Sequence, residues 1–226
     1  MTLPSATVSP SPNYGERRGG LRPSLIVIHY TAMTSCAAAR ARLCDPAAEV
    51  SAHWLISATG EVEALVPEEM RAWHAGAGSW RGQDDVNSRS VGVELVNTGA
   101  QPFPEPQMAA LEAMLAGTCA RWGIGPADVI GHSDMAPGRK TDPGARFDWR
   151  RLALAGLSVW PKLGEPGDLR ADLLAFGYPE AAPDVLLGAF RLRFRPWACG
   201  PLDDTDRAMA AGLAEAAPLD GPARRA

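Results

Sequence analysis

The chain has 226 residues, 46% of them hydrophobic, and its 22 basic and 26 acidic side chains give a formal net charge of -4 at pH 7. This length predicts one main domain with a small appendage. The acidic balance excludes the basic surface of a dedicated nucleic-acid-binding protein, and no run approaches the roughly 18 apolar residues of a membrane-spanning helix. We therefore expect no nucleic-acid partner and no membrane association.

Residues 1–20 are rich in Ser, Pro and Gly, and predict an irregular arm. They hold no apolar stretch of the kind found in secretory signal peptides, so a cytoplasmic location is expected. The four cysteines have no Cys-x-x-Cys spacing, which predicts free thiols rather than a metal knuckle or a redox motif.

The first half of the chain predicts a strand, a helix, a hairpin and a long loop. These elements are expected at 25–30, at 35–44, at 51–57 with 61–66, and at 71–89. The strand is apolar on both faces, as in a sheet that is covered on both sides, and His29 lies near its end. The loop carries Trp, His and Gly without regular spacing, a composition that is typical of functional loops.

The second half predicts a strand, an amphipathic helix, a short strand, a loop rich in Pro and Gly, and a helix. These are expected at 90–97, 106–122, 128–131, 133–145 and 148–154. In the first of these strands the apolar residues alternate with Gly92 and Glu94, so Glu94 faces away from the apolar side. After a linker at 162–167, three short helices are expected at 168–176, 184–194 and 204–216.

Strands that alternate with helices predict an α/β fold with a central mixed β-sheet flanked by helices, followed by a small three-helix module. The expected organisation is a main domain over 1–161, a helical domain over 168–217 and a disordered tail over 218–226.

Three polar residues, His29, Glu94 and His132, lie in or just after predicted strands, where such folds place their sites. His132 and Asp142 share a loop that can fold back and bring the imidazole and the carboxylate together. Two histidines and one aspartate, with a fourth position left to water, match the ligand count of a catalytic zinc site. The residues alone leave a second interpretation open, in which His29 is a hydrogen-bonded core histidine and Asp142 caps a turn.

Five segments resemble, in order, the zinc N-acetylmuramoyl-L-alanine amidases of the AmpD and AmiD type. They are HYT at 29–31, SAHWLI at 51–56, AWHAG at 72–76, GVEL at 92–95 and GHSDMAPGRKTDPG at 131–144. A further segment, 189–196, is similar to part of the peptidoglycan-binding-like module that follows the amidase domain in the AmiD type.

The resemblance implies a zinc ion held by His29, His132 and Asp142, with Glu94 and Lys140 as the catalytic residues. It implies hydrolysis of the amide bond between L-alanine and N-acetylmuramic acid, in its ordinary or its 1,6-anhydro form. Zinc lowers the pKa of a bound water to about 7. Glu94 would pass a proton from that water to the leaving nitrogen, and Lys140 would stabilise the charge that develops on the carbonyl oxygen.

Substrate contacts are expected from Trp54, Trp80, Arg81 and Arg89. Either tryptophan could stack on a sugar ring, although core packing is an equally open interpretation. Family members often have an arginine nine residues before the catalytic glutamate, suited to a peptide carboxylate, and this chain has Asp85 there. Arg81 or Arg89 is expected to take that role.

For two other sets of side chains a structural role is weighed against a functional one. His53 and His74 are expected to make structural hydrogen bonds. Three arginines of the C-terminal module either contact an anionic glycan or form a solvated basic face: Arg191, Arg193 and Arg195.

The function that we expect is that of a monomeric amidase acting on muropeptides in cytoplasmic peptidoglycan recycling. One alternative is a lysin or periplasmic enzyme that acts on the intact cell wall. Another is a non-catalytic peptidoglycan-recognition protein, which the presence of all five implied site residues disfavours.

Overall fold

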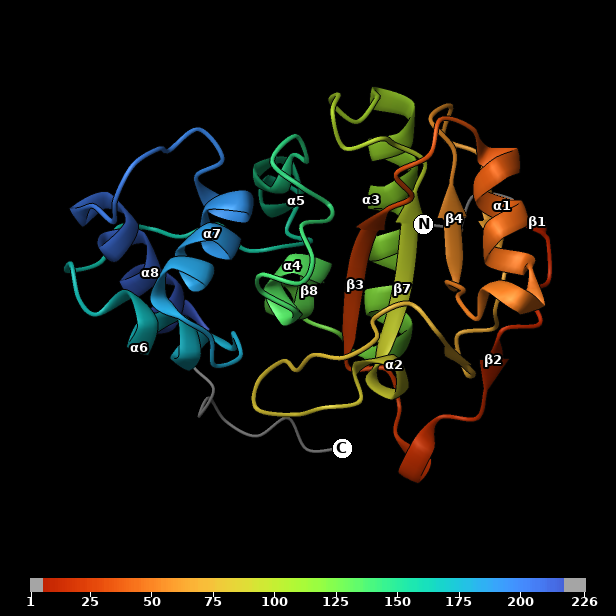
Figure 1. The fold of residues 1–226 in the computed structure, drawn as a ribbon, viewed down its shortest axis with the longest axis horizontal. Helices are drawn as coiled ribbons and strands as arrows, with labels where there is room; N and C mark the ends of the chain where they lie inside the picture. Colours follow the sequence, from red (N-terminus) through yellow and green to blue (C-terminus); the bar gives the residue numbers. More distant parts are fainter. Residues whose placement is uncertain (1–5, 218–226) are drawn as a thin grey trace.

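The computed structural model describes residues 6–217 of the chain. A mixed six-stranded sheet has the order β1-β5-β4-β7-β3-β8, and a two-stranded sheet pairs β2 with β6 (Figure 1). The strands are β1 Thr7–Val8, β2 Tyr14–Gly15, β3 Leu25–Tyr30, β4 Trp54–Ile56, β5 Val62–Ala64, β6 Arg71–Ala72, β7 Ser90–Leu95 and β8 Val129–Gly131.

The helices divide into those of the sheet domain and those of the C-terminal module. The first group is α1 Cys36–Cys44, α2 Val86–Arg89, α3 Glu105–Trp122, α4 His132–Met135 and α5 Trp149–Leu154, and the second is α6 Leu169–Phe176, α7 Pro183–Phe194 and α8 Asp204–Ala216. The predicted α/β fold with a central mixed sheet, and the three predicted C-terminal helices, are confirmed. The expected tail at 218–226 lies outside the described residues.

The two faces of the sheet are covered by different helices. Ile26 and Ile28 of β3 pack in a cluster with α3, whereas Leu25 and Val27 pack in a second cluster with the C-terminal helices. Because side chains alternate along a strand, His29 lies on the face opposite α3. Strand β7 runs parallel to β3 and pairs Glu94 with His29, so both polar side chains leave the same face at adjacent positions.

Two predictions of irregular structure are partly wrong. The N-terminal arm contributes β1, which pairs with β5 at the sheet edge, and Ser11, Asn13 and Arg17 on it are buried. Arg17 donates hydrogen bonds to the carbonyls of residues 68, 87, 88 and 90. The predicted loops also contain α2 and α4, each of only four residues, too short to produce a periodic pattern.

A buried polar network joins the C-terminal module to the sheet domain. Arg193 of α7 donates to Asp134 Oδ2 at 2.6 Å, to the Val129 carbonyl at 3.0 Å and to Ser158 Oγ at 3.1 Å. The Tyr178 hydroxyl donates to Asp134 Oδ1 at 2.6 Å. Since Asp134 also accepts from the Gly131 N–H, this network holds the first turn of α4, which begins at His132.

The other two arginines of the module are also engaged within the protein. Arg191 pairs with Asp206, and Arg195 pairs with Asp203 and Asp206. The interpretation as a solvated basic face is therefore wrong, because the three guanidinium groups make internal contacts, whereas contact with an anionic glycan stays a prediction. Over residues 6–217, no helix combines the length and the apolar character needed to cross a membrane.

Candidate metal centre and active site

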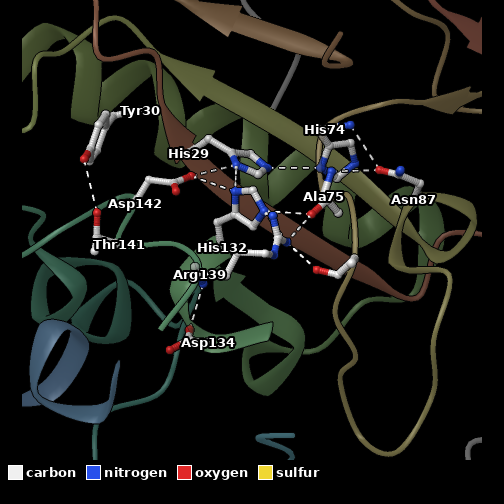
Figure 2. Close-up of polar contacts among 12 residues, drawn as sticks. His29, Tyr30, His74, Ala75, Asn87, His132, Asp134, Arg139, Thr141 and Asp142 are labelled. Carbon is white, nitrogen blue, oxygen red and sulfur yellow. Dashed lines mark hydrogen bonds and ion pairs between the residues drawn. The ribbon is translucent and has the colours of Figure 1, made fainter. Parts of the chain in front are cut away.

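Three side chains from separate elements converge at one end of the sheet. His29 comes from β3, His132 is the first residue of α4, and Asp142 follows in the loop after α4. Their ligand atoms are His29 Nδ1, His132 Nδ1 and Asp142 Oδ2, separated by 2.9 Å between the two nitrogens and by 2.8 and 3.0 Å to the carboxylate oxygen (Figure 2). The structure therefore brings together the three residues that the sequence predicted as a metal site.

The chemistry of this cluster fits a cation. His132 Nε2 lies 2.8 Å from the Ala75 carbonyl, which can only accept, so Nε2 carries the hydrogen and Nδ1 presents a lone pair to the cluster. Burial, followed by the neighbouring His132, lowers the pKa of His29 to about 4, so His29 is neutral at pH 7. Burial opposes ionisation of Asp142, but the close approach of His132 and His29 to its carboxylate outweighs burial and holds the pKa of this carboxyl well below its usual range.

Glu94 lies beside the cluster and lines the same cavity. Its Oε2 atom is buried and has no hydrogen-bond partner among the described residues. Burial, and then the charge of Asp142, raise the pKa of Glu94 to about 8, while Lys140 opposes the shift. A carboxyl group whose pKa lies near neutrality is suited to accept a proton and to give it back.

The cavity has a volume of about 430 Å³ and is lined by the cluster and by three cationic side chains. One of them, Arg139, donates to the carbonyls of Ala75 and Ala77, which leaves Lys140 and Arg42. Lys140 lies two residues before Asp142, and Arg42 comes from α1. Within residues 6–217 neither cationic group has a hydrogen bond or ion pair, so both can meet a ligand. The sequence predicted Lys140; it gave no signal for Arg42, which looks like one more basic residue on an Ala- and Arg-rich helix.

The four predicted substrate contacts lie elsewhere. Trp80 is fully buried against Phe176 and Tyr178, and none of the four lines the cavity. The polar groups of the other three are engaged within the protein: Trp54 Nε1 donates to Glu68, Arg81 pairs with Asp128, and Arg89 donates to the carbonyls of Trp80 and Gln83. The structure thus assigns Trp54, Trp80, Arg81 and Arg89 to structural contacts, contrary to the prediction.

The mixed sheet, the His–His–Asp cluster and the adjoining carboxyl and ammonium groups define a class of protein, the hydrolases whose site can hold a divalent metal ion. Residues 19–145 match the family described as Amidase_2, N-acetylmuramoyl-L-alanine amidase. The chain belongs to this family.

Two curated relatives and one solved structure extend the match. The N-acetylmuramoyl-L-alanine amidase AmiD of Escherichia coli K12 is 35% identical over 86% of this chain and 83% of its own length. The 1,6-anhydro-N-acetylmuramyl-L-alanine amidase AmpD of Citrobacter freundii is 35% identical over 66% of this chain and 89% of its own. The structure of E. coli AmiD with anhydro-N-acetylmuramic acid-L-Ala-D-γ-Glu-L-Lys has a TM-score of 0.78 and 32% identity, covering 90% of this chain and 98% of that one.

Proposed function

We propose that this protein hydrolyses the amide bond between N-acetylmuramic acid and L-alanine in muropeptides, with a zinc ion held by His29, His132 and Asp142. The convergence of these three ligand atoms beside Glu94 carries the proposal. The relatives named above are amidases of this bond, and AmiD is known with a bound anhydromuramyl tripeptide.

The metal ion, when bound, would supply a Lewis acid that acidifies a water molecule and polarises the scissile carbonyl. Glu94 has the position and the raised pKa to take a proton from the attacking water. It then gives that proton to the alanine nitrogen as the carbon–nitrogen bond breaks. The products are a free muramic carboxylic acid and a peptide with a free amino terminus.

Lys140 is proposed to stabilise the charge that develops on the carbonyl oxygen. Its ammonium group belongs to the same cavity as Glu94 and lowers the pKa of that carboxyl, so the two side chains interact electrostatically. A fixed positive charge in a largely buried site acts more strongly on a developing oxyanion than it would in water.

Arg42 is proposed to bind a carboxylate of the peptide stem. The AmiD ligand contains a γ-linked D-Glu, whose α-carboxylate is free. Since Arg81 and Arg89 are engaged in structural contacts, Arg42 is the arginine of the cavity whose guanidinium has no partner within the described residues. A guanidinium can take a carboxylate through two parallel hydrogen bonds.

We also propose a role in recycling, because the name of AmpD specifies the 1,6-anhydro sugar and that of the AmiD ligand an anhydro sugar. A cytoplasmic location, a monomeric state and the domain limits at 161 and 168 stay predictions. Action on the intact wall is the second candidate, favoured by similarity to AmiD over the module as well as the amidase domain.

The experiment is to incubate the zinc-loaded protein with anhydro-N-acetylmuramic acid-L-Ala-D-γ-Glu-L-Lys and to analyse the products by mass spectrometry. We expect free tripeptide and anhydro-N-acetylmuramic acid, and no turnover after treatment with a chelator. Intact substrate after prolonged incubation with the zinc-loaded protein would contradict the proposal. Purified cell-wall sacculi are tested in parallel, and release of peptide from them would favour action on the intact wall over recycling.

A further inference from the structure

His74 lies behind the cluster, between the ligand His29 and strand β7. Its Nδ1 atom is 3.0 Å from His29 Nε2, and its Nε2 atom is 3.1 Å from Ser90 Oγ (Figure 2 shows the contact with His29). Ser90 Oγ lies 2.6 Å from the Val86 carbonyl oxygen. The side chains thus form one chain of hydrogen bonds that runs from a backbone carbonyl to a metal-ligand candidate.

The donor and the acceptor of every hydrogen bond in this series are determined. Two oxygens 2.6 Å apart need a hydrogen between them, and the Val86 carbonyl has none to give, so the Ser90 hydroxyl donates to it. Ser90 Oγ must then accept from His74 Nε2–H. A neutral His74 with its hydrogen on Nε2 has a lone pair on Nδ1, which accepts from His29 Nε2–H. His29 Nδ1 is consequently left with a lone pair that points at His132 and Asp142.

Both histidine ligands are therefore oriented by consecutive residues of one loop. The side chain of His74 fixes His29, and the carbonyl of Ala75 accepts from His132 Nε2–H. The loop itself is pinned, because Asn87 Oδ1 accepts from the backbone N–H groups of His74 at 3.1 Å and Ala75 at 2.8 Å. As a result, three atoms that bear lone pairs face one another, an arrangement that a shared cation stabilises.

The His74 ring packs against β7 at Gly92, and it fits there because glycine has no side chain. A Cβ atom on Gly92 would lie 2.4 Å from His74 Cγ, far inside contact distance. Gly92 is also the neighbour of His53, whose Nδ1 accepts from the Gly92 N–H at 2.8 Å. His53 is equally buried but contacts neither histidine ligand by a hydrogen bond, so it provides a matched control.

We propose that His74 is a positioning residue for the metal, acting through His29: its Nδ1 acceptor fixes the ligand's tautomer and ring orientation, with Ser90 fixing that of His74. This inference rests on the proposed metal site. Partners of this kind behind a ligating histidine typically contribute about 10–100-fold to metal affinity. A buried histidine with a merely structural role would affect the stability of the fold and leave zinc affinity unchanged.

The test is the zinc dissociation constant of the metal-stripped full chain, measured by competition with a chromophoric chelator. We expect His74→Ala to weaken zinc binding about 10–100-fold. His74→Asn should restore most of the affinity, because Asn Oδ1 occupies the place of the imidazole Nδ1 and accepts from His29. Ser90→Ala should weaken binding less than His74→Ala does. The control His53→Asn should lower the melting temperature and leave the zinc dissociation constant as in the wild type.

Unchanged zinc affinity in folded His74→Ala would overturn the inference, as would equal weakening by His74→Ala and His74→Asn. If circular dichroism shows that His74→Ala does not fold, His74→Asn and Ser90→Ala decide. An affinity close to that of the wild type in His74→Asn, together with reduced affinity in Ser90→Ala, supports the inference, and any other combination rejects it. Failure of the wild type to bind zinc is a different result, which contradicts the proposed function itself.

Discussion

Replacing Arg193 by methionine should cost the protein about 3–5 kcal/mol of unfolding free energy. The side chains of Arg193 and Asp134 are only 1% and 0% exposed, and their nitrogen and oxygen lie 2.6 Å apart. Methionine fills much of the volume but leaves the Asp134 carboxylate as a buried charge without its cation. The Val129 carbonyl and Ser158 also lose a donor, which adds to the cost.

The assay is urea unfolding followed by circular dichroism, with a matched variant in the same module. Arg170 and Glu180 form an exposed ion pair, with side chains 49% and 64% exposed. Arg170→Met should therefore cost less than about 1 kcal/mol. For a chain of this size each kcal/mol lowers the melting temperature by about 2–4 °C, so Arg193→Met should melt at least about 6 °C below the wild type.

The double variant Arg193→Met with Asp134→Asn should be less destabilised than the sum of the two single variants, because no buried charge is left unpaired. Since the pair joins α7 to α4, we also expect the wild type to unfold in a single transition. Equal losses in Arg193→Met and Arg170→Met would refute the reasoning, as would separate transitions for the module and the sheet domain.

Glu94→Gln should reduce kcat about 10²–10⁴-fold, and Lys140→Met should also lower kcat more than it changes KM, since both side chains act on the reacting atoms. Because burial raises the pKa of Glu94 from 4.5 to about 8, the folded metal-free chain holds a proton that the unfolded chain releases. The contribution of Glu94 to the unfolding free energy should therefore be lost as the pH rises from about 4.5 to 8, and Glu94→Gln should lack this loss. Arg42→Ala should raise KM about three- to tenfold for a stem with a free D-Glu α-carboxylate, and should have little effect when that group is an amide. Gly92→Ala should destabilise the wild type strongly but cost little in a His74→Ala background, where the clashing ring is gone; additive losses would contradict that explanation.

The sequence predicted those features of the site that local patterns encode. Alternation along β7 placed Glu94 opposite the apolar face, and the strand that ends near His29 was recognisable from its continuous apolar run. The convergence of His132 and Asp142 followed from their short separation. Each of these inferences needs only the period of a strand or the reach of one loop.

The remaining features depend on contacts between residues that are far apart in the chain. The burial of Trp80 arises where the loop at 71–89 meets Phe176 and Tyr178, about a hundred positions later, and Arg81 pairs with the distant Asp128. The role of His74 depends on the tautomer set by Ser90, and a four-residue helix such as α4 has no periodic signal. Residue type alone does not report such contacts.

The most direct test of the account is the position of the metal in crystals of the zinc-loaded protein, located by anomalous scattering at the zinc absorption edge. We expect one peak per chain, about 2.0–2.2 Å from His29 Nδ1, His132 Nδ1 and a carboxylate oxygen of Asp142, with a fourth position filled by solvent. A zinc peak held by other residues, or bonded to the Nε2 atom of either histidine, would contradict the proposed centre.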